Sequence, residues 1–235
     1  MSAKPLCYRF LVGSSNIRKM ITGSIGVRET HGDLFSKLIG TKGFAAENFA
    51  EKEFDDRIVL PKPFIVSEEF PFICATPDFI IEDHKGNLSV LEVKSGGDPK
   101  SAKANAFSLR SRTQVKVALE VLGLKKGLIY AVNRDDPFND CKYAGEKHLK
   151  SDDFLFTNRQ KIIEGYVRYL DNFFTQIHSI ELSEEQKREL LEYIDSHVPK
   201  LPDRSKQQPS LEQLKERSDF WKKKRDGLVC HKAEE

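Results

Sequence analysis

Asp78, Glu92 and Lys94 are the residues of this sequence whose types and spacing suit catalysis. They lie in ATPDFIIEDHKGNLSVLEVKSGG, where two apolar stretches flank a short turn. Two crowded carboxylates repel each other, so one of them holds a proton unless a cation lies between them. Such hard oxygen ligands suit Mg²⁺ or Mn²⁺, and a nearby lysine can orient a water molecule or a charged phosphate. Together these residues are typical of metal-assisted phosphodiester hydrolysis.

A β-hairpin is predicted to bring the three residues together. The turn DHKGN places Gly86 where a three-residue hairpin loop requires the left-handed conformation. With this loop, Asp78 falls opposite Glu92, and residues opposite each other in an antiparallel pair share a face of the sheet. Lys94 is two residues beyond Glu92 and lies on the same face, whereas Val93 points into the core.

The same residues also have an ordinary structural interpretation. Pro-Asp at the start of a strand is common turn chemistry, and Glu-x-Lys on an exposed strand is usually a solvated salt bridge. The strand LSVLEVKS is quite apolar, which makes a solvated face less natural without excluding one. The hairpin alone therefore leaves a catalytic and a structural interpretation open.

The composition fits one globular domain with a substantial core. The chain has 235 residues, of which 39% are hydrophobic and 31% charged, and its formal net charge of +2 identifies no partner. The four cysteines are far apart and form no C-x-x-C, which argues against a zinc or iron–sulfur site and favours a reduced compartment. Because neither a signal peptide nor a membrane-spanning stretch is evident, we expect an intracellular protein, in the cytoplasm or nucleus.

Helices and strands are expected in the order helices, strands, helix, strand, helices, which predicts a mixed α/β domain. Helical periodicity or capping marks residues 31–40, 43–54, 108–123, 158–178, 183–197 and 211–227. Strand-like stretches cover residues 57–66, 70–83, 88–94 and 127–132. Residues 1–30 show no clear period, and 198–210 resemble a flexible connector. We expect one domain over residues 1–200, followed by a polar linker and helix over 201–235.

Pro77-Asp78 followed by Glu92-Val93-Lys94 resembles the signature of the PD-(D/E)xK nucleases. Further segments resemble, in the same order, those of the bacteriophage lambda exonuclease and YqaJ-like viral recombinase group: RKMITGS, GFAAENFA and TQVKVALEVLGLKKGLIYAV. DDFLFTNRQKIIEGYVRYLDNFF is similar to that group's closing strand and helix. The resemblance covers most of the chain. It implies a restriction-endonuclease-like core, a mixed central β-sheet flanked by helices, with extra C-terminal helices.

The resemblance implies a role for each hairpin residue that matches the family pattern. Asp78 and Glu92 would be the main ligands of a Mg²⁺ ion, for which Mn²⁺ can substitute, and the backbone carbonyl of Val93 would be another. Lys94 would position or activate the attacking water.

Two residues outside the hairpin match the family pattern on their helices. Glu47 would complete the metal shell, although an ordinary surface acid is the alternative and Glu51, one turn further, is a competing candidate. Gln114 would hydrogen-bond in the pocket and help to place Lys94 or the water, where the alternative is a solvated helix glutamine.

Basic residues are expected to bind DNA. In family terms Arg18 and Ser24 would bind a 5′-terminal phosphate, but the basic residue is one position nearer the serine than in the family, so Lys19 is a second candidate. Phosphate-neutralising contacts with the DNA backbone are expected from Lys100, Lys103, Arg110 and Arg112, each of which has a solvated loop as its alternative. The run WKKKR at 221–225 suits a nuclear localisation signal, a DNA-binding segment or a solvated helix end.

The function implied by the resemblance is a metal-dependent exonuclease that degrades linear double-stranded DNA from its 5′ ends, in recombination or repair. Double-stranded DNA ends would be its substrate, a single-strand annealing protein a possible partner, and a homotrimeric ring its assembly. The alternatives are a structure- or sequence-specific endonuclease of the same fold and a DNA-binding module without catalysis, since a fold does not fix the substrate. An intact Asp78, Glu92 and Lys94 set argues against the inactive module.

Overall fold

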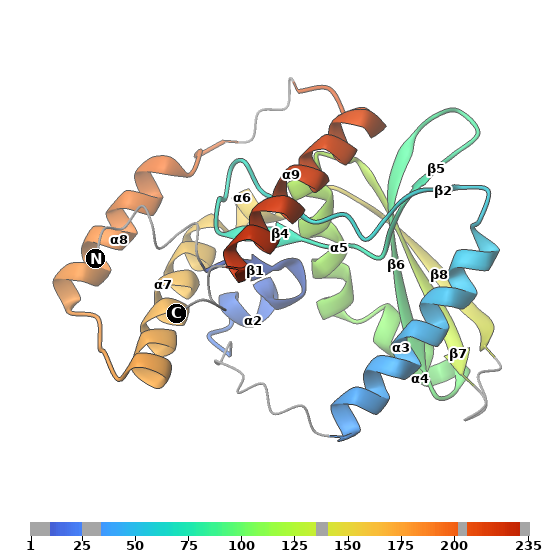
Figure 1. Ribbon diagram of the computed structural model, residues 1–235, viewed down its shortest axis with the longest axis horizontal. Coiled ribbons are helices and arrows are strands. Elements are labelled where there is room, and N and C mark those ends of the chain that lie inside the picture. The colour runs from blue at the N-terminus through green and yellow to red at the C-terminus, as the bar shows by residue number, and fades with distance from the viewer. Residues whose placement is uncertain (1–9, 25–33, 135–140, 202–205, 231–235) are drawn as a thin grey trace.

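The computed structural model describes residues 10–24, 34–134, 141–201 and 206–230. Its strands are β1 (Val12–Gly13), β2 (Ile58–Pro61), β3 (Ile65–Val66), β4 (Ile73–Ala75), β5 (Phe79–Glu82), β6 (Leu88–Gly96), β7 (Lys126–Arg134) and β8 (Cys141–Lys150). They form a five-stranded sheet of order β2-β5-β6-β7-β8 and a three-stranded sheet of order β1-β4-β3 (Figure 1). The large sheet is mixed because β6 and β7 pair in parallel and its other neighbours are antiparallel.

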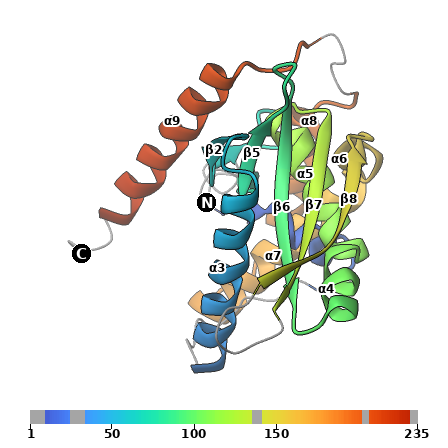
Figure 2. The ribbon, with the colours of Figure 1, turned by 90° about the vertical axis from the view of Figure 1, so that its right-hand side faces the viewer.

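Helices cover the large sheet on both faces, as Figure 2 shows for α3 on one side and α5 on the other. The helices are η1 (Ser14–Asn16, 3-10), α2 (Ile17–Ile21), α3 (Leu34–Glu53), α4 (Pro99–Ala106), α5 (Leu109–Leu122), α6 (Phe154–Thr157), α7 (Arg159–His178), α8 (Glu184–His197) and α9 (Leu211–Cys230). The predicted class, a mixed sheet flanked by helices, is therefore confirmed.

Alternation along the strands separates two hydrophobic cores. Strand residues Phe79, Ile81, Leu91 and Val93 belong to the core that also holds Ala46 and Ala50 of α3. Their neighbours on the opposite face, such as Ile80 and Val90, belong to the larger core with α5, α7 and the small sheet. Glu92 alternates with Leu91 and Val93, so its side chain lies on the α5 face of the sheet.

The predicted hairpin register is confirmed. Pairing runs from Phe79 opposite Leu91 to Glu82 opposite Leu88, and Asp83 N donates to Asn87 O over 3.0 Å. Gly86 closes the loop with φ +77°, the left-handed conformation that the turn requires. Continuing this register by one residue places Asp78 opposite Glu92, as the sequence predicts.

The predicted long helices also form, with the expected ends. α5 begins at the N-cap Ser108, whose side chain accepts from Ser111 N, and it ends at Gly123 with φ +75°. α8 begins with the capping box of Ser183 and Gln186. The apolar stripe of α7 is buried within its own chain, as its residues Ile163, Val167, Leu170 and Phe174 show.

Several local predictions are wrong. Residues 34–53 form one continuous helix rather than two, because glycines inside a helix cost only about 1 kcal/mol each and did not break it. The sequence predicts one strand over 57–66, but Lys62, with φ +42°, turns the chain out of β2, and β3 joins the small sheet. The stretch 70–83 is likewise divided, with β4 in the small sheet and β5 in the large one. The expected closing strand near 153–157 is the helix α6, and β8 is the last strand among the described residues. Residues 31–33 of the first predicted helix lie outside the described residues.

The C-terminal helix α9 lies against the body of the protein. Leu214 and Ser218 are fully buried, and Ser218 Oγ accepts a hydrogen bond from Phe64 N over 3.1 Å. Arg217 donates to the carbonyl oxygen of Val121 at the end of α5. The polar helix predicted for 211–227 is therefore present and anchored, while the division at residue 200 stays a prediction. In the described ranges, no helix combines the length and apolar character needed to cross a membrane.

Candidate active site

Four predicted residues meet beside the hairpin. Asp78 directly precedes β5, Glu92 and Lys94 lie on β6, and Gln114 lies on α5, which covers that face of the sheet. The hairpin register fixes the first three relative to one another, and the packing of α5 on the sheet brings in the fourth. Short-range turn geometry and tertiary packing together therefore build the cluster.

Glu92 is the centre of the cluster. Its side chain is 3% exposed, and Oε1 accepts two hydrogen bonds, from Lys94 Nζ at 2.5 Å and from Gln114 Nε2 at 2.6 Å. The other oxygen, Oε2, is buried and has no hydrogen-bond partner among the residues that the structure describes. Leaving a carboxylate oxygen buried and unpaired is costly, so Oε2 is a position where a ligand would gain binding energy.

Asp78 lies close enough to Glu92 for their charges to interact. Burial, followed by the charge of Glu92 and a smaller effect of Glu47, raises the pKa of Asp78 well above its usual range. Val93 N, which donates to Asp78 Oδ2 at 2.7 Å, and the charge of Lys94 act in the opposite direction. The crowding of carboxylates that the sequence predicts is therefore present, and a bound cation would relieve it.

Lys94 is held as a cation. Burial acts to lower the pKa of Lys94, but the charge and hydrogen bond of Glu92, with the charge of Asp78, raise it above its usual value. The charge of Arg110 works against them. In this arrangement Lys94 is a hydrogen-bond donor and a fixed positive charge rather than a free base.

The donor set fits a hard divalent cation. Asp78 and Glu92 supply adjacent carboxylates, Glu92 Oε2 is unpaired, and backbone carbonyls are further oxygen donors of the kind that Mg²⁺ accepts alongside water. Nowhere in the described ranges do three or more His, Cys, Asp or Glu side chains gather as a complete metal site. A Mg²⁺ ion here would therefore take most of its ligands from backbone, water and substrate, which is its usual behaviour in proteins.

Glu47 is near the cluster but paired. Its Oε2 lies 2.6 Å from Lys62 Nζ, and its charge contributes to the raised pKa of Asp78. The backbone N of Lys62 donates to Asp78 O over 2.9 Å, so Lys62 connects the two acids. The competing candidate Glu51 is exposed and lines a separate pocket of about 470 Å³ with Asn48, Lys52 and Asp55.

Sequence reasoning missed Lys62. It belongs to no motif, and only the proline on either side marks this place as a departure from a strand. A lysine with positive φ is uncommon. Lys62 adopts this conformation, and its backbone N–H donates to the carbonyl oxygen of Asp78.

The proposed phosphate-binding residues lie together at the end of α2. Ser24 N and Oγ both donate to Lys19 O, at 2.8 and 3.4 Å, and Ser24 Oγ lies 2.8 Å from Thr22 Oγ1. Arg18 and Lys19 are half-buried in the preceding turn. α2 packs against α5, the helix that carries Gln114. The structure thus groups the three predicted residues, and their role stays a prediction.

The basic residues predicted to contact the DNA backbone lie on the two helices that follow the catalytic strand. Lys100 and Lys103 are exposed on α4, whose capping box is formed by Asp98 and Ser101. Arg110 is exposed and Arg112 half-buried on the first turn of α5. Because the charge of Arg110 is felt by Lys94, this end of α5 is close to the acid cluster.

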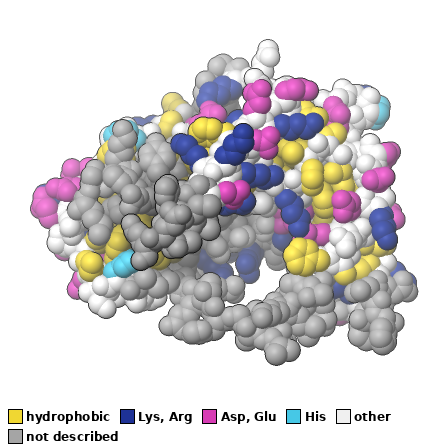
Figure 3. Space-filling model, in the orientation of Figure 1, with side chains coloured by type: hydrophobic (Ala, Val, Ile, Leu, Met, Phe, Trp, Pro, Cys, Tyr) yellow, Lys and Arg dark blue, Asp and Glu magenta, His cyan; other side chains and the backbone are white. Residues whose placement is uncertain are grey.

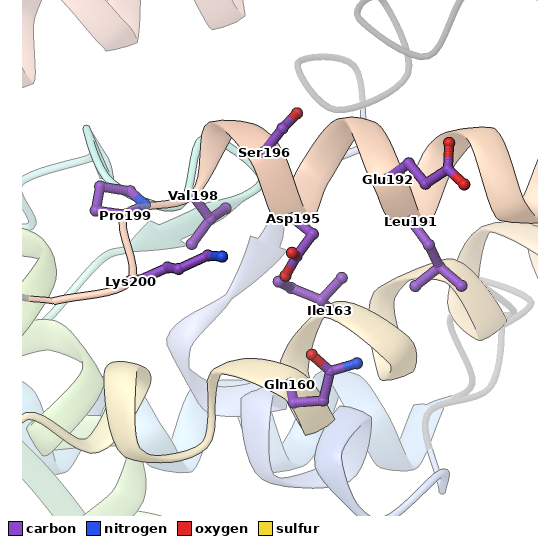
Figure 4. Close-up of a pocket in the computed structure, with 9 residues that line it drawn as sticks. All are labelled: Gln160, Ile163, Leu191, Glu192, Asp195, Ser196, Val198, Pro199 and Lys200. Atoms are coloured by element: carbon purple, nitrogen blue, oxygen red, sulfur yellow. The ribbon is translucent and has the colours of Figure 1, made fainter.

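A larger pocket lies elsewhere, between α7 and α8. It measures about 690 Å³, and Figure 4 shows Gln160 and Ile163 of α7 facing Leu191 and Asp195 of α8. None of the predicted site residues lines it. Its two acids, Glu192 and Asp195, are ion-paired with Arg188 and Arg159, and we assign the chemistry to the hairpin cluster instead.

Comparison with known proteins supports the fold. No protein-family model and no curated protein matches the sequence. The structure resembles the alkaline exonuclease LHK-Exo from Laribacter hongkongensis, solved in complex with dAMP, with a TM-score of 0.51 and 14% identity, covering 75% of this chain and 96% of that one. A phage-related exonuclease from Haemophilus somnus 129PT has a TM-score of 0.42 and 12% identity, covering 74% and 99%. The predicted fold, a mixed central sheet flanked by helices, is confirmed and is shared with LHK-Exo.

Proposed function

We propose that this protein is a metal-dependent deoxyribonuclease, an exonuclease that hydrolyses linear double-stranded DNA from its 5′ ends in recombination or repair. The observation that carries the proposal is the environment of Glu92, a buried carboxylate opposite Asp78 with one oxygen held by Lys94 and Gln114 and the other unpaired. A solvated salt bridge, the ordinary alternative, would not bury its acid to 3% exposure.

Each residue of the cluster has a distinct part in the proposed reaction. Asp78, Glu92 and the Val93 carbonyl would hold Mg²⁺ or Mn²⁺, which would supply Lewis-acid stabilisation of phosphate charge and a more acidic water. Gln114 fixes the rotamer of Glu92, so that Oε1 stays turned to Lys94 and Oε2 stays available. Lys94 donates to the attacking water or to a phosphate oxygen and balances the charge that develops there.

Digestion from the 5′ end is proposed on the basis of the basic and hydroxyl residues at the end of α2. Arg18 and Lys19 in the last turn of α2 and Ser24 just beyond it provide cationic and hydroxyl groups, a combination suited to a terminal phosphate dianion. A ring of three chains that encloses the duplex is proposed for assembly, and a single-strand annealing protein as partner for the product.

Digestion of matched linear and covalently closed circular duplexes tests the activity, with Mg²⁺ and with EDTA. We expect linear DNA to be degraded with Mg²⁺ only and closed circles to stay intact, because an exonuclease requires an end. Efficient nicking of closed circles would replace this proposal by an endonuclease of the same fold. Absence of cleavage of either duplex in Mg²⁺ would favour a DNA-binding module.

Glu92→Gln tests whether the cleavage activity depends on the hairpin cluster. The variant removes one charge without changing volume, and we expect no detectable cleavage while DNA binding is kept. Glu82→Gln is the matched control, since Glu82 ends β5 at the far end of the same hairpin. Retained cleavage by Glu92→Gln would place the active site elsewhere.

A further inference from the structure

Three aromatic rings, on α3, on α9 and in the segment after β2, each have a cation over them. Lys62 Nζ lies 4.9 Å from the ring centre of Phe44, and Lys224 Nζ lies 4.7 Å from that of Phe220. The third pair joins α9 to the 62–64 segment, because Arg225 Cζ lies 5.2 Å from the ring centre of Phe64. We call these three pairs the aromatic–basic strip: Phe44 with Lys62, Phe64 with Arg225, and Phe220 with Lys224.

The strip joins α9 to the acid cluster. Lys62 and Phe64 are two residues apart in the sequence and Arg225 directly follows Lys224, so the Phe64–Arg225 contact links the other two pairs through the chain. At one end Lys62 contacts Glu47 through its side chain and Asp78 through its backbone. Figure 1 shows α9 running across the front of the molecule, and Figure 3 shows hydrophobic and basic side chains next to one another on this face.

The cations of α9 are available to an anion. Among the described residues, Lys222, Lys223 and Lys224 form no ion pair with an acid. Within the described part of the chain, Arg225 has one acidic partner, the neighbouring Asp226. Four basic side chains in the five residues 221–225 therefore concentrate positive charge at the outer end of the strip. Such a concentration attracts a phosphate backbone.

Two of the three rings are exposed as well. Phe44 is 57% and Phe220 is 52% exposed, although large aromatic side chains are ordinarily buried. A duplex turns the faces of its bases inward, so exposed rings add nothing to duplex binding. A single strand offers unpaired bases that stack on such rings while its phosphates meet the cations. The combination of exposed rings and the neighbouring lysines of α9 therefore fits a single strand better than a duplex.

We propose that the aromatic–basic strip binds single-stranded DNA beside the active site. The inference rests on the proposed function for the source of that strand, which is the one left after its complement is digested. Bases stack on Phe220 and Phe44, and Lys62, Lys224 and Arg225 meet the phosphates between them.

Trp221 is a built-in reporter for the test. It is the single tryptophan of the chain, its ring centre lies 5.2 Å from that of Phe220, and Lys224 also lies over it. Its fluorescence is followed while the full-length protein is titrated with a 20-nucleotide oligothymidylate, in EDTA so that no metal-dependent cleavage occurs. A blunt 20-base-pair duplex is titrated in parallel. We expect the single strand to quench the emission and the duplex to bind less tightly.

Phe220→Ala tests the stacking. Loss of one stacked base is worth about 1–3 kcal/mol, so the affinity for the single strand should fall about 5- to 150-fold, as measured by anisotropy of a labelled oligonucleotide. Tyr143→Ala is the matched control, because Tyr143 is a similarly exposed aromatic residue on β8, 54% exposed and outside the strip. Thermal melting of both variants checks that each is folded.

Lys224→Gln tests the electrostatic part. The slope of log affinity against log salt should become shallower by about 0.7 for one lost phosphate contact on a single strand. Lys161→Gln, an exposed lysine on α7, should leave the slope unchanged.

The outcomes separate this inference from the proposed function. Equal affinity of Phe220→Ala and the unsubstituted protein, or equal losses on duplex and single strand, would overturn the strip as a single-strand site. Cleavage of linear DNA with Mg²⁺ is measured separately. If the protein binds the single strand through the strip but does not cleave DNA, only the proposed nuclease activity is refuted. If it cleaves DNA but Phe220→Ala binds the single strand normally, only the single-strand site is refuted.

Discussion

Glu120 predicts a measurable pH dependence of stability far from the acid cluster. Its carboxylate on α5 accepts hydrogen bonds from Leu155 N at 3.0 and 3.2 Å, which ties α6 to the core. Burial, opposed by hydrogen bonds from the backbone of Leu155 and Phe154, raises the pKa of Glu120 from 4.5 to about 8, with a further contribution from Asp153 and Asp152. The folded protein therefore holds a proton that the unfolded chain releases.

The sign and size of the pH dependence follow from the difference between the pKa of Glu120 in the folded protein and in the unfolded chain. An acid whose pKa is raised on folding contributes stability that is complete below the unfolded pKa of about 4.5 and is lost as the pH rises toward about 8. Each pH unit is worth about 1.4 kcal/mol, so the roughly 2.5 units between pH 4.5 and 7 correspond to an upper value of about 3.5 kcal/mol. Water reaches part of this side chain, so we expect about 3 kcal/mol or less.

Glu120→Gln removes the titration and keeps an oxygen to accept from Leu155 N. In urea unfolding at several pH values, we expect the variant and the unsubstituted protein to be similar near pH 4.5 and the variant to be more stable by up to about 3 kcal/mol at pH 7. Glu164→Gln on α7 is the control, since Glu164 bonds to Gln160 at the exposed side of that helix. Parallel pH profiles for Glu120→Gln and the unsubstituted protein would refute the buried proton.

Three further predictions concern the active site and assembly. Lys94→Ala should abolish cleavage but still bind Mn²⁺, measured by calorimetry, because the carboxylates remain. A 5′-phosphorylated end should be digested faster than a 5′-hydroxyl end, and Arg18→Ala should reduce that preference, since charge-assisted hydrogen bonds are worth about 1.5–3 kcal/mol each. Equal rates on both ends would reject the phosphate site. Light scattering at micromolar concentration should give the mass of three chains, and a trap-DNA challenge should show processive digestion.

The features predictable from sequence are those fixed by short-range geometry. The loop that ends at Gly86 sets the hairpin register, and this register alone places Asp78 opposite Glu92. Capping at Ser108 and Ser183 likewise marks the starts of α5 and α8. The contact of Gln114 with Glu92 spans 22 residues, and only the family resemblance indicated it.

The features missed are those without a periodic signal. The strands β1 and β3 have two residues each, too few to show an alternation, and they form only because β4 lies between them. β8 is largely exposed, so its sequence lacks the apolar residues that mark a half-buried strand. Lys62 matters through its backbone conformation and tertiary partners, which no local pattern encodes.

The two outer strands of the large sheet limit how copies of this protein can associate. β8 carries lysines along its open side, and β2 is four residues long, ends in Pro61 and is followed by Lys62. Short length, proline and lysine are the means by which natural proteins stop a sheet from growing by adding a strand from another molecule. Association into a ring would therefore have to use side-chain surfaces of helices and loops rather than backbone pairing, and the isolated protein should resist fibrillar aggregation at these edges.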